Sequence, residues 1–465
     1  MKEKKNRRYK TMRKGHNIFK AWKILTQGML IALYFLASAQ VMREIWKERY
    51  LPVTLLYMVM LEVSYLMLEA GNIEQRRILD LVYGQFFGAL CANLFFALLM
   101  YTVSTLSFEA ILLYFFTLTL LEVMSGILWA VLFFWIYLKG QSFKKALFIY
   151  GNRERMPETV LENNRINGYF QITKSMHFRE GIPKAMKLME ECEAVFLGDI
   201  PCQERNELMK TAVRMDRECY SIPKVTDIYI KNTTILRLYD KVLFRCSQSR
   251  LTREQEVIKR AEDVIVSFLL LVPALPVMLL IALGIKLEDR GPVFYRQKRV
   301  TKGGREFDML KFRSMHVDAE KDGPRLAGKY DSRITKVGRV IRNLHFDELP
   351  QLFNIFRGEM SLVGPRPERR EFIEEYAKII PEFTERLKVR GGLTGYAQIY
   401  GKYNTGPEDK IKYDLIYIYQ YSLRLDIRLL FLTVRILFQK ENAEGVEEKE
   451  QDDTGDQKGD GHGKH

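Results

Sequence analysis

Four long apolar segments near the start of the chain constrain its fold more than any other feature. They cover about residues 21–42, 51–69, 79–104 and 109–138. Each approaches or exceeds the roughly 20 residues that an α-helix needs to cross a bilayer. Buried core helices of a water-soluble protein are the alternative, but four consecutive segments of this length fit it poorly. Residues 1–140 are therefore expected to form a four-helix transmembrane region.

Four glutamates interrupt these apolar segments, namely Glu62, Glu69, Glu109 and Glu122. An ionisable side chain is costly in the hydrocarbon core of a bilayer. Some faces of the predicted helices are therefore expected to be buried between helices rather than exposed to lipid.

Basic residues flank the predicted helices mostly on one side. With four spans, three basic flanks fall on the same side, which the positive-inside tendency makes the cytoplasmic one. The loop at 43–50 is also basic and argues weakly for the opposite orientation. No signal-peptide cleavage site follows the N-terminal stretch. The three flanks are residues 1–15, Arg76 with Arg77, and Lys139 with Lys144 and Lys145.

The chain carries a formal charge of +15, from 72 Lys and Arg against 57 Asp and Glu. An anionic membrane surface, a phosphorylated substrate and nucleic acid are all partners for such an excess. Charge alone does not choose among them. The five cysteines form no CxxC pair, so a disulfide framework or a zinc site is not expected.

Residues 141–250 are predicted to form a separate, small Rossmann-like α/β domain. The stretches "ALFIYGN" (146–152) and "EAVFLGDI" (193–200) are apolar strands that end in glycine-containing turns. Polar helical stretches lie between and after them, which indicates a parallel sheet. The first turn offers only Gly151 where a dinucleotide site needs several glycines. A structural or regulatory domain is therefore favoured over a nucleotide-binding one.

A fifth apolar segment, residues 264–285, carries Pro273 and Pro276 in its middle. Proline removes a backbone donor and kinks a helix. Both flanks of the segment are basic, so a simple crossing would place one basic cluster outside the cell. A re-entrant membrane helix over 257–287, broken at the two prolines, satisfies the charge bias. A kinked helix that spans the bilayer is the alternative.

Two basic stretches follow this segment. "EFDMLKFRSM" (306–315) alternates apolar and polar residues, as a half-buried strand does, and it carries Lys311 and Arg313. "DSRITKVGRVIRN" (331–343) places basic residues three apart, so Arg342 belongs to a basic stripe on a helix. A surface that binds lipid headgroups is the alternative interpretation of that stripe.

The stretch "HFDELPQLFNIF" (345–356) places Asp347 beside Glu348 and Pro350 two residues later. Asp is favoured at the start of a helix and Pro in its first turn. The helix dipole would keep Asp347 ionised, as a carboxylate nucleophile must be. Glu348 would point roughly 100° away around the axis, towards a partner such as a metal ion. A capping Asp347 beside a solvated Glu348 is the alternative.

Two arginines complete the predicted site. Arg366 lies between Pro365 and Pro367, so a stiff loop presents its guanidinium, which suits bidentate phosphate contacts. Arg390 precedes a glycine-rich turn that allows close approach to a ligand. Carboxylates, arginines and a divalent cation point to phosphoryl transfer. Mg²⁺ suits such a site because it binds one or two carboxylates together with phosphate oxygens.

From about residue 257 to 438 the chain resembles the bacterial sugar transferases known as monotopic polyprenyl-phosphate phosphoglycosyl transferases. The matching stretches are "FYRQKRV", "KFRSM", "ITKVGRVIR", "DELPQLFNIFRGEMSLVGPRPE" and "GLTGYAQ". With its four-helix front and small α/β domain, the chain resembles the larger members that initiate exopolysaccharide, capsule or O-antigen synthesis. It departs from the family at Gly391, where proline is usual, and at Tyr396, where tryptophan is usual.

The resemblance implies transfer of a sugar-1-phosphate from a UDP-sugar to polyprenyl (undecaprenyl) phosphate. Asp347 would be the nucleophile that forms an aspartyl-phosphosugar intermediate, and Glu348 would hold Mg²⁺. Phosphate or substrate would contact Lys311, Arg313, Arg342, Arg366 and Arg390. The implied fold is membrane α plus α/β, with a mixed α/β catalytic domain over 251–440 that includes the re-entrant helix. The acidic tail, 441–465, is expected to be disordered.

The expected location is the bacterial cytoplasmic (inner) membrane, with several passes and the active site on the cytoplasmic face. The expected partners are a UDP-sugar, polyprenyl phosphate and membrane lipids, with no nucleic acid, and a homo-oligomer is left open. The alternative function is a non-catalytic basic scaffold that binds anionic lipid or nucleic acid. A nearer rival is a glycosyltransferase that moves the sugar without its phosphate.

Overall fold

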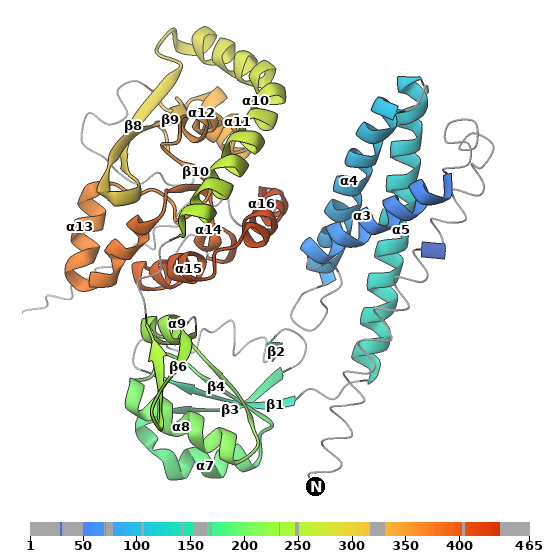
Figure 1. The fold of residues 1–465 in the computed structure, drawn as a ribbon. Helices are drawn as coiled ribbons and strands as arrows, with labels where there is room; N and C mark the ends of the chain where they lie inside the picture. Colours follow the sequence, from blue (N-terminus) through green and yellow to red (C-terminus); the bar gives the residue numbers. More distant parts are fainter. Residues whose placement is uncertain are drawn as a thin grey trace, which may run out of the picture. The chain divides into compact units, whose positions relative to one another are not determined.

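The computed structural model describes most of the chain in two compact units, Met1–Asp227 and Ile228–His465 (Figure 1). The predicted helix at 21–42 lies outside the described residues except for positions 28 and 29, and the predicted tail at 441–465 lies outside them entirely. The described residues are 28–29, 50–68, 70, 78–103, 107–140, 144–151, 165–166, 170–231, 233–246, 251–316, 331–401 and 405–437.

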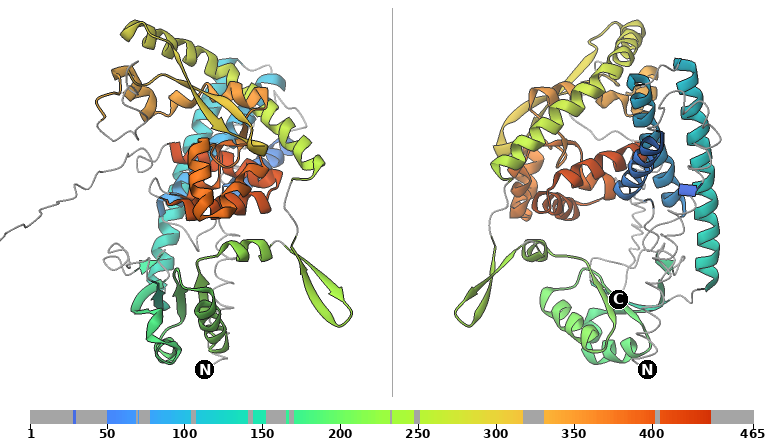
Figure 2. Two further views of the ribbon diagram at one scale, coloured as in Figure 1. Left: turned by 90° about the vertical axis from the view of Figure 1, so that its left-hand side faces the viewer. Right: turned by 45° about the vertical axis from the view of Figure 1, so that its right-hand side comes forward.

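The other three apolar segments near the start of the chain are helices, as predicted. They are α3 (Tyr50–Met67), α4 (Ile78–Val103) and α5 (Phe108–Gly140). α4 packs against both α3 and α5 (Figure 2). Large apolar side chains such as Leu94, Phe116 and Leu128 point outwards and are exposed.

Three helices of the described residues are long and apolar enough to cross a membrane, which indicates membrane association. The qualifying stretches are Leu81–Thr102, Phe108–Leu132 and Arg253–Asp289. The stretch Pro52–Met67 of α3 is apolar but shorter.

A five-stranded sheet follows α5 and has the order β2-β3-β1-β4-β5. β2 runs antiparallel to β3, and the other neighbours pair in parallel. The strands predicted around 146–152 and 193–200 are confirmed as β1 and β4, which pair directly. The strands are β1 (Lys144–Tyr150), β2 (Arg165–Ile166), β3 (Phe170–His177), β4 (Ala194–Leu197) and β5 (Glu218–Ser221).

Two helices, α7 (Ile182–Glu190) and α8 (Cys202–Arg214), bury apolar side chains with β1 and β4 in one core. The glycine that ends β1 has a steric reason. A Cβ atom on Gly151 would lie 1.9 Å from the backbone oxygen of Asp199, so the ends of β1 and β4 can approach only because this residue has no side chain.

A short helix and a hairpin precede the carboxyl-terminal region. The helix is α9 (Val225–Lys231), and the hairpin consists of β6 (Thr234–Leu238) and β7 (Lys241–Arg245), seen as a two-stranded ribbon in Figure 2. All residues of both strands are exposed. The sequence analysis did not predict this hairpin.

The carboxyl-terminal region packs around one long helix, α10 (Arg253–Asp289). Its core joins Leu271 of α10 to Met309, Ile355, Leu362 and Leu429. Two small sheets complete the region: an antiparallel pair, β8 (Phe294–Val300) and β9 (Glu306–Phe312), and a parallel pair, β10 (Ser361–Val363) and β11 (Gly392–Thr394). The shorter helices are α11 (Lys336–Asn343), α12 (Gln351–Arg357), α13 (Arg370–Ile379), α14 (Tyr396–Tyr400), α15 (Pro407–Tyr419) and α16 (Leu423–Leu437). Short 3₁₀ turns are η3 (Lys302–Gly304), η4 (Phe346–Glu348) and η5 (Pro381–Lys388).

The helix predicted to be broken at its prolines is continuous in the structure. α10 includes both Pro273 and Pro276, and its ribbon changes direction along its length without an interruption (Figure 1). α10 therefore stays one helix through both prolines instead of separating into two, since a helix tolerates a missing donor when the flanking turns remain bonded. Re-entry into the membrane stays a prediction.

Candidate active site

The carboxylate pair lies on a single 3₁₀ turn, η4, between α11 and α12. His345 precedes the turn with a left-handed backbone (φ 57°) and reverses the chain after α11. The helix expected after the pair is confirmed as α12, but its N-cap position is Pro350. No side chain caps α12. Asp347 lies near the start of this helix, as predicted, but on the 3₁₀ turn before it. Pro350 marks the start of the helix, which agrees with the preference of proline for this end.

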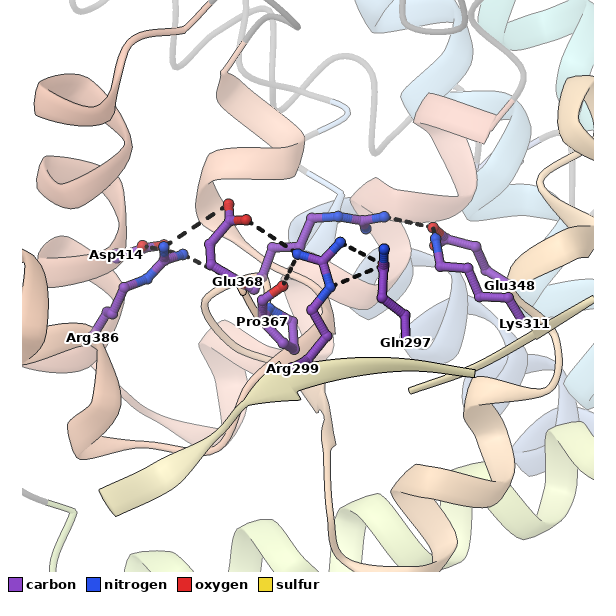
Figure 3. A network of polar contacts seen from close by, with 9 residues as sticks. Gln297, Arg299, Lys311, Glu348, Pro367, Glu368, Arg386 and Asp414 are labelled. Atoms are coloured by element: carbon purple, nitrogen blue, oxygen red, sulfur yellow. Dashed lines mark hydrogen bonds and ion pairs between the residues drawn. The ribbon is translucent and has the colours of Figure 1, made fainter. Parts of the chain in front are cut away.

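One carboxylate oxygen of Glu348 accepts hydrogen bonds from two cationic side chains. Nζ of Lys311, on β9, donates to Oε1 at 2.9 Å, and Nη2 of Arg366, on the loop after β10, donates to the same atom at 2.5 Å (Figure 3). The Glu348 side chain is 17% exposed. Burial alone would raise the pKa of Glu348, but Arg366 and Lys311 outweigh it and hold the pKa well below its ordinary value. Glu348 is therefore a stable carboxylate.

Asp347 is half-buried beside this ion pair. Burial raises the pKa of Asp347 above its ordinary value, and the charge of Glu348 adds to the rise. Lys311, Arg342 and His345 act in the opposite direction. The nearby positive side chains, and not the dipole of a helix that Asp347 caps, are therefore what favours the ionised form of Asp347 against burial.

Arg342 and Arg390 lie on different elements. Arg342 lies in the last turn of α11 and acts to lower the pKa of Asp347. Arg390 lies two residues before β11, and parallel pairing of β10 with β11 brings it beside the loop that carries Arg366. Its Nε is buried and has no hydrogen-bond partner in the described part of the chain.

The glycines after Arg390 are used for backbone packing. A Cβ atom on Gly392 would lie 2.1 Å from the backbone nitrogen of Gly364. The sequence predicts a close approach at this turn. In the structure the turn approaches the backbone of the loop that contains Pro365 and Pro367.

Arg313 has a different environment from Lys311, although the two are only two residues apart. Its guanidinium pairs with Asp289 at the end of α10 and fills the space above Gly291, where a side chain would collide with it. In the described structure no contact joins Arg313 to Asp347 or Glu348. Arg313 thus secures the connection between α10 and β8, and its predicted contact with phosphate stays untested.

A buried ion network that the sequence analysis missed supports the loop of Arg366 (Figure 3). Nη2 of Arg386, on η5, donates to the backbone oxygen of Arg366 at 2.9 Å and lies 3.0 Å from Oδ2 of Asp414, on α15. The two side chains are only 4% and 2% exposed. Burial raises the pKa of Asp414 to about 6, against the opposing effect of Arg386. An Asp inside the apolar run "YDLIYIY" was the only sequence signal for this network.

A second arginine fixes the far end of the same loop. Nη1 of Arg299, on β8, lies 3.3 Å from both the backbone oxygen of Pro367 and the Glu368 carboxylate. The backbone N–H of Val300 donates to the backbone oxygen of Glu368 at 3.0 Å. The loop is therefore held from β8, η5 and β11.

Asn354, another residue missed in the sequence, ties α12 to β9. Its side chain is completely buried. It accepts from the Leu310 backbone N–H at 3.0 Å and donates to the backbone oxygen of Asp308 at 2.8 Å. It also donates to Glu359 at 2.6 Å. The Asn354 amide thus forms hydrogen bonds with the backbone of β9, close to Lys311 in the sequence.

The donor set fits a divalent cation bound together with a phosphate. Both cationic contacts of Glu348 use Oε1, and within the described residues Oε2 accepts no hydrogen bond. Among the described residues, no group of three or more His, Cys, Asp or Glu side chains could hold a metal ion by itself. One or two carboxylates suffice for Mg²⁺ when substrate phosphate supplies further ligands.

Comparison with known proteins assigns the chain to a family. A sequence model described as bacterial sugar transferase matches residues 254–440. The exopolysaccharide production protein PSS of Rhizobium leguminosarum bv. phaseoli is 39% identical over 189 residues, which are 38% of this chain and 94% of that protein. The chain belongs to the bacterial sugar transferase family. All of the side chains described above between Arg299 and Asp414 fall within the part that matches the bacterial sugar transferase model.

Two further relatives of this bacterial sugar transferase match over part of their length. UDP-N-acetylgalactosamine-undecaprenyl-phosphate N-acetylgalactosaminephosphotransferase of Aeromonas hydrophila is 44% identical over 39% of this chain and 43% of its own. UDP-glucose:undecaprenyl-phosphate glucose-1-phosphate transferase of Xanthomonas campestris pv. campestris is 39% identical over 54% of each chain. The chain thus spans about half the length of these relatives.

Proposed function

We propose that this protein transfers a sugar-1-phosphate from a UDP-sugar to undecaprenyl phosphate. The observation that carries the proposal is the Asp347–Glu348 pair, with Lys311 and Arg366 bound to Glu348 and Arg342 acting on Asp347. The names of the Aeromonas and Xanthomonas relatives state this class of reaction for those proteins. Adjacent carboxylates among convergent cations suit the transfer of a charged phosphoryl group.

In the first step, a carboxylate oxygen of Asp347 attacks the sugar-bearing phosphorus of the UDP-sugar. An Asp347 oxygen–phosphorus bond forms, the bond from that phosphorus to the UMP oxygen breaks, and UMP leaves with the electron pair. In this proposal Arg366, Arg342 and Lys311 would neutralise the phosphate oxygens. The product is an aspartyl-phosphosugar.

In the second step, a phosphate oxygen of undecaprenyl phosphate attacks the same phosphorus. The bond to Asp347 breaks, the carboxylate is restored, and the phosphosugar leaves on the lipid. Glu348 would hold Mg²⁺ through Oε2, and a bound Mg²⁺ neutralises phosphate charge. The paired cations keep Glu348 ionised for that role.

The apolar helices and the substrates together suggest the cellular location. UDP-sugars are cytoplasmic metabolites, so the active site would face the cytoplasm from the bacterial inner membrane, with α10 in or across the bilayer. The reaction would be the first membrane step of exopolysaccharide, capsule or O-antigen synthesis. The Rossmann-like character of the five-stranded sheet and a four-helix membrane bundle belong to the same proposal.

The test is the Asp347→Asn variant, which keeps the shape of the side chain and removes the nucleophile. We expect UMP release and lipid labelling to fall by about 10³-fold or more, with an unchanged unfolding midpoint. In the wild type, acid quenching with a UDP-sugar and no lipid should leave phosphosugar on the peptide that contains Asp347, detected by mass spectrometry. Undiminished turnover in the variant would exclude the covalent step.

The identity of the released nucleotide separates this reaction from its rivals. Release of UMP indicates phosphosugar transfer, whereas release of UDP would indicate a glycosyltransferase that moves only the sugar. A basic scaffold that binds anionic lipid or nucleic acid would release neither nucleotide.

A further inference from the structure

A closed group of polar side chains lies inside the apolar helices α3, α4 and α5. Glu122 of α5 is 2% exposed, and Tyr57 of α3 and Asn93 of α4 are also buried. The Tyr57 hydroxyl contacts Oδ1 of Asn93 at 2.5 Å and also contacts Oε1 of Glu122. Nδ2 of Asn93 donates to Oε2 of Glu122 at 3.0 Å and to Oγ1 of Thr119 at 2.9 Å.

The number of available protons decides the charge of Glu122. The Tyr57 hydroxyl has a single proton, yet its oxygen lies against two acceptors, Oδ1 of Asn93 and Oε1 of Glu122. If Glu122 were ionised, that proton could form a hydrogen bond in only one of the two contacts. The other contact would place two buried oxygens together with no hydrogen between them, which is costly.

Reversing the amide of Asn93 does not remove this conflict. The reversed amide would donate to the Tyr57 oxygen, and Tyr57 would donate to Oε1 of Glu122. Oδ1 of Asn93 would then face Oε2 of Glu122, again with no hydrogen between them. An ionised Glu122 therefore leaves one unsatisfied oxygen pair in either orientation.

One proton on Glu122 satisfies every contact. Oε1–H of Glu122 donates to the Tyr57 oxygen, Tyr57 donates to Oδ1 of Asn93, and Nδ2 of Asn93 donates to Oε2 of Glu122. The three hydrogen bonds form a closed ring through three helices. With the amide reversed, the ring closes in the opposite sense.

The charges of the side chains that contact Glu122 also bear on its protonation. In the described residues no Lys, Arg or His contacts its carboxyl group. Among the titratable side chains of α3, Tyr57 contacts it. Apolar side chains of α5, such as Leu120 and Met124, point outwards on the same helix.

We infer that Glu122 is a proton-binding site that stays occupied at neutral pH, and that the bound proton closes a ring joining α3, α4 and α5. The side chain acts as a neutral donor and acceptor between helices, a role that polar residues fill in membranes. The inference does not depend on the proposed transferase activity.

The test uses the full chain in lipid nanodiscs at neutral pH and its Glu122→Gln variant. The Gln amide reproduces the protonated carboxyl, since Nε2 can donate to Tyr57 while Oε1 accepts from Asn93. We expect the infrared difference spectrum, wild type minus E122Q, to contain the C=O band of a protonated carboxyl group. Carboxylate stretching bands in that spectrum would overturn the inference.

Thermal unfolding provides a second measurement. E122Q should unfold at the wild-type midpoint, whereas Glu122→Ala should lose roughly 2–4 °C. An E122Q midpoint as low as that of E122A, or a failure of E122Q to fold, would show that the negative charge is required and would overturn the inference.

Gln85 offers a matched control because it is equally buried in α4 but lies against Gly126, outside the ring. Glu122→Gln in a Gln85→Met background should yield the same infrared difference band. If Gln85→Met abolished the band, the assignment of the proton to the ring would be wrong.

Discussion

At the scale of single residues, the candidate site separates the arginine that contacts Glu348 from the arginine that positions it. Arg366 donates to Glu348 through its side chain, while its backbone oxygen accepts from Arg386. Because Pro365 and Pro367 flank Arg366, neither neighbour offers a backbone N–H to help orient this peptide. Arg386 is therefore a positioning residue for Arg366.

Substituting Arg386→Gln should lower kcat for UMP release by about 10²-fold, since a small displacement of a positioned group has effects of this size. The KM for the UDP-sugar should change much less. The loss should not add to that of Arg366→Lys in the double variant, because both act through the same guanidinium. Steady-state kinetics of the four proteins checks this, with size-exclusion profiles to confirm folding.

Arg370→Gln is the matched control for Arg386→Gln. Arg370 forms an exposed ion pair with Glu306 at 2.5 Å and lies just beyond the same loop. Exposed pairs contribute little, so its kcat should stay close to the wild-type value. Equal losses in the two variants, or full additivity with Arg366→Lys, would contradict the positioning role.

At the scale of elements, the site depends on how α12 is fixed to β9. The short helix follows the carboxylate pair, and the strand carries Lys311, so their relative position sets the Lys311–Glu348 contact. Asn354 makes that connection through the backbone of Asp308 and Leu310. Arg260 of α10 secures the other end of α12 by donating to the Ile355 and Phe356 oxygens, both at 2.7 Å.

Asn354→Ala should destabilise the protein by about 1–3 kcal/mol for each buried backbone group left unpaired. It should also reduce turnover at temperatures where the variant is folded, because Lys311 is no longer held against Glu348. Unfolding midpoints and UMP release measure the two effects. Asn343→Ala, at an exposed position on α11, should change neither, and a comparable loss there would refute the argument.

At the scale of the whole molecule, the site is confined to one unit. Every residue of the carboxylate pair, its cations and the supporting network lies in Ile228–His465. The match to the bacterial sugar transferase family falls within the same unit. The charged groups of the proposed chemistry therefore all come from this unit.

Removal of divalent metal should stop turnover and leave the fold intact. Because Lys311 and Arg366 already neutralise Glu348, EDTA should not lower the unfolding midpoint. UMP release should disappear and return when Mg²⁺ is added in excess. Full activity in EDTA would rule out the proposed role of the metal.

The sequence by itself determined the features that depend on neighbouring residues. The length of the apolar segments specified the helices α3, α4, α5 and α10. A long apolar segment in a membrane must satisfy its backbone hydrogen bonds internally, as a helix does. Apolar runs that end in glycine-containing turns located β1 and β4. Proline and an adjacent acidic pair located the turn before α12, because a proline restricts the backbone wherever it occurs.

Only the tertiary structure decided which charges meet. Lys311 and Arg366 bind Glu348 from positions 37 and 18 residues away, whereas Arg313, two residues from Lys311, pairs with Asp289. Arg386 with Asp414, and the ring of Tyr57, Asn93 and Glu122, are likewise distant in the chain. Long-range contacts of this kind depend on how elements pack, which local preferences do not encode. A buried charge takes whichever partner that packing provides, since leaving it unpaired is costly.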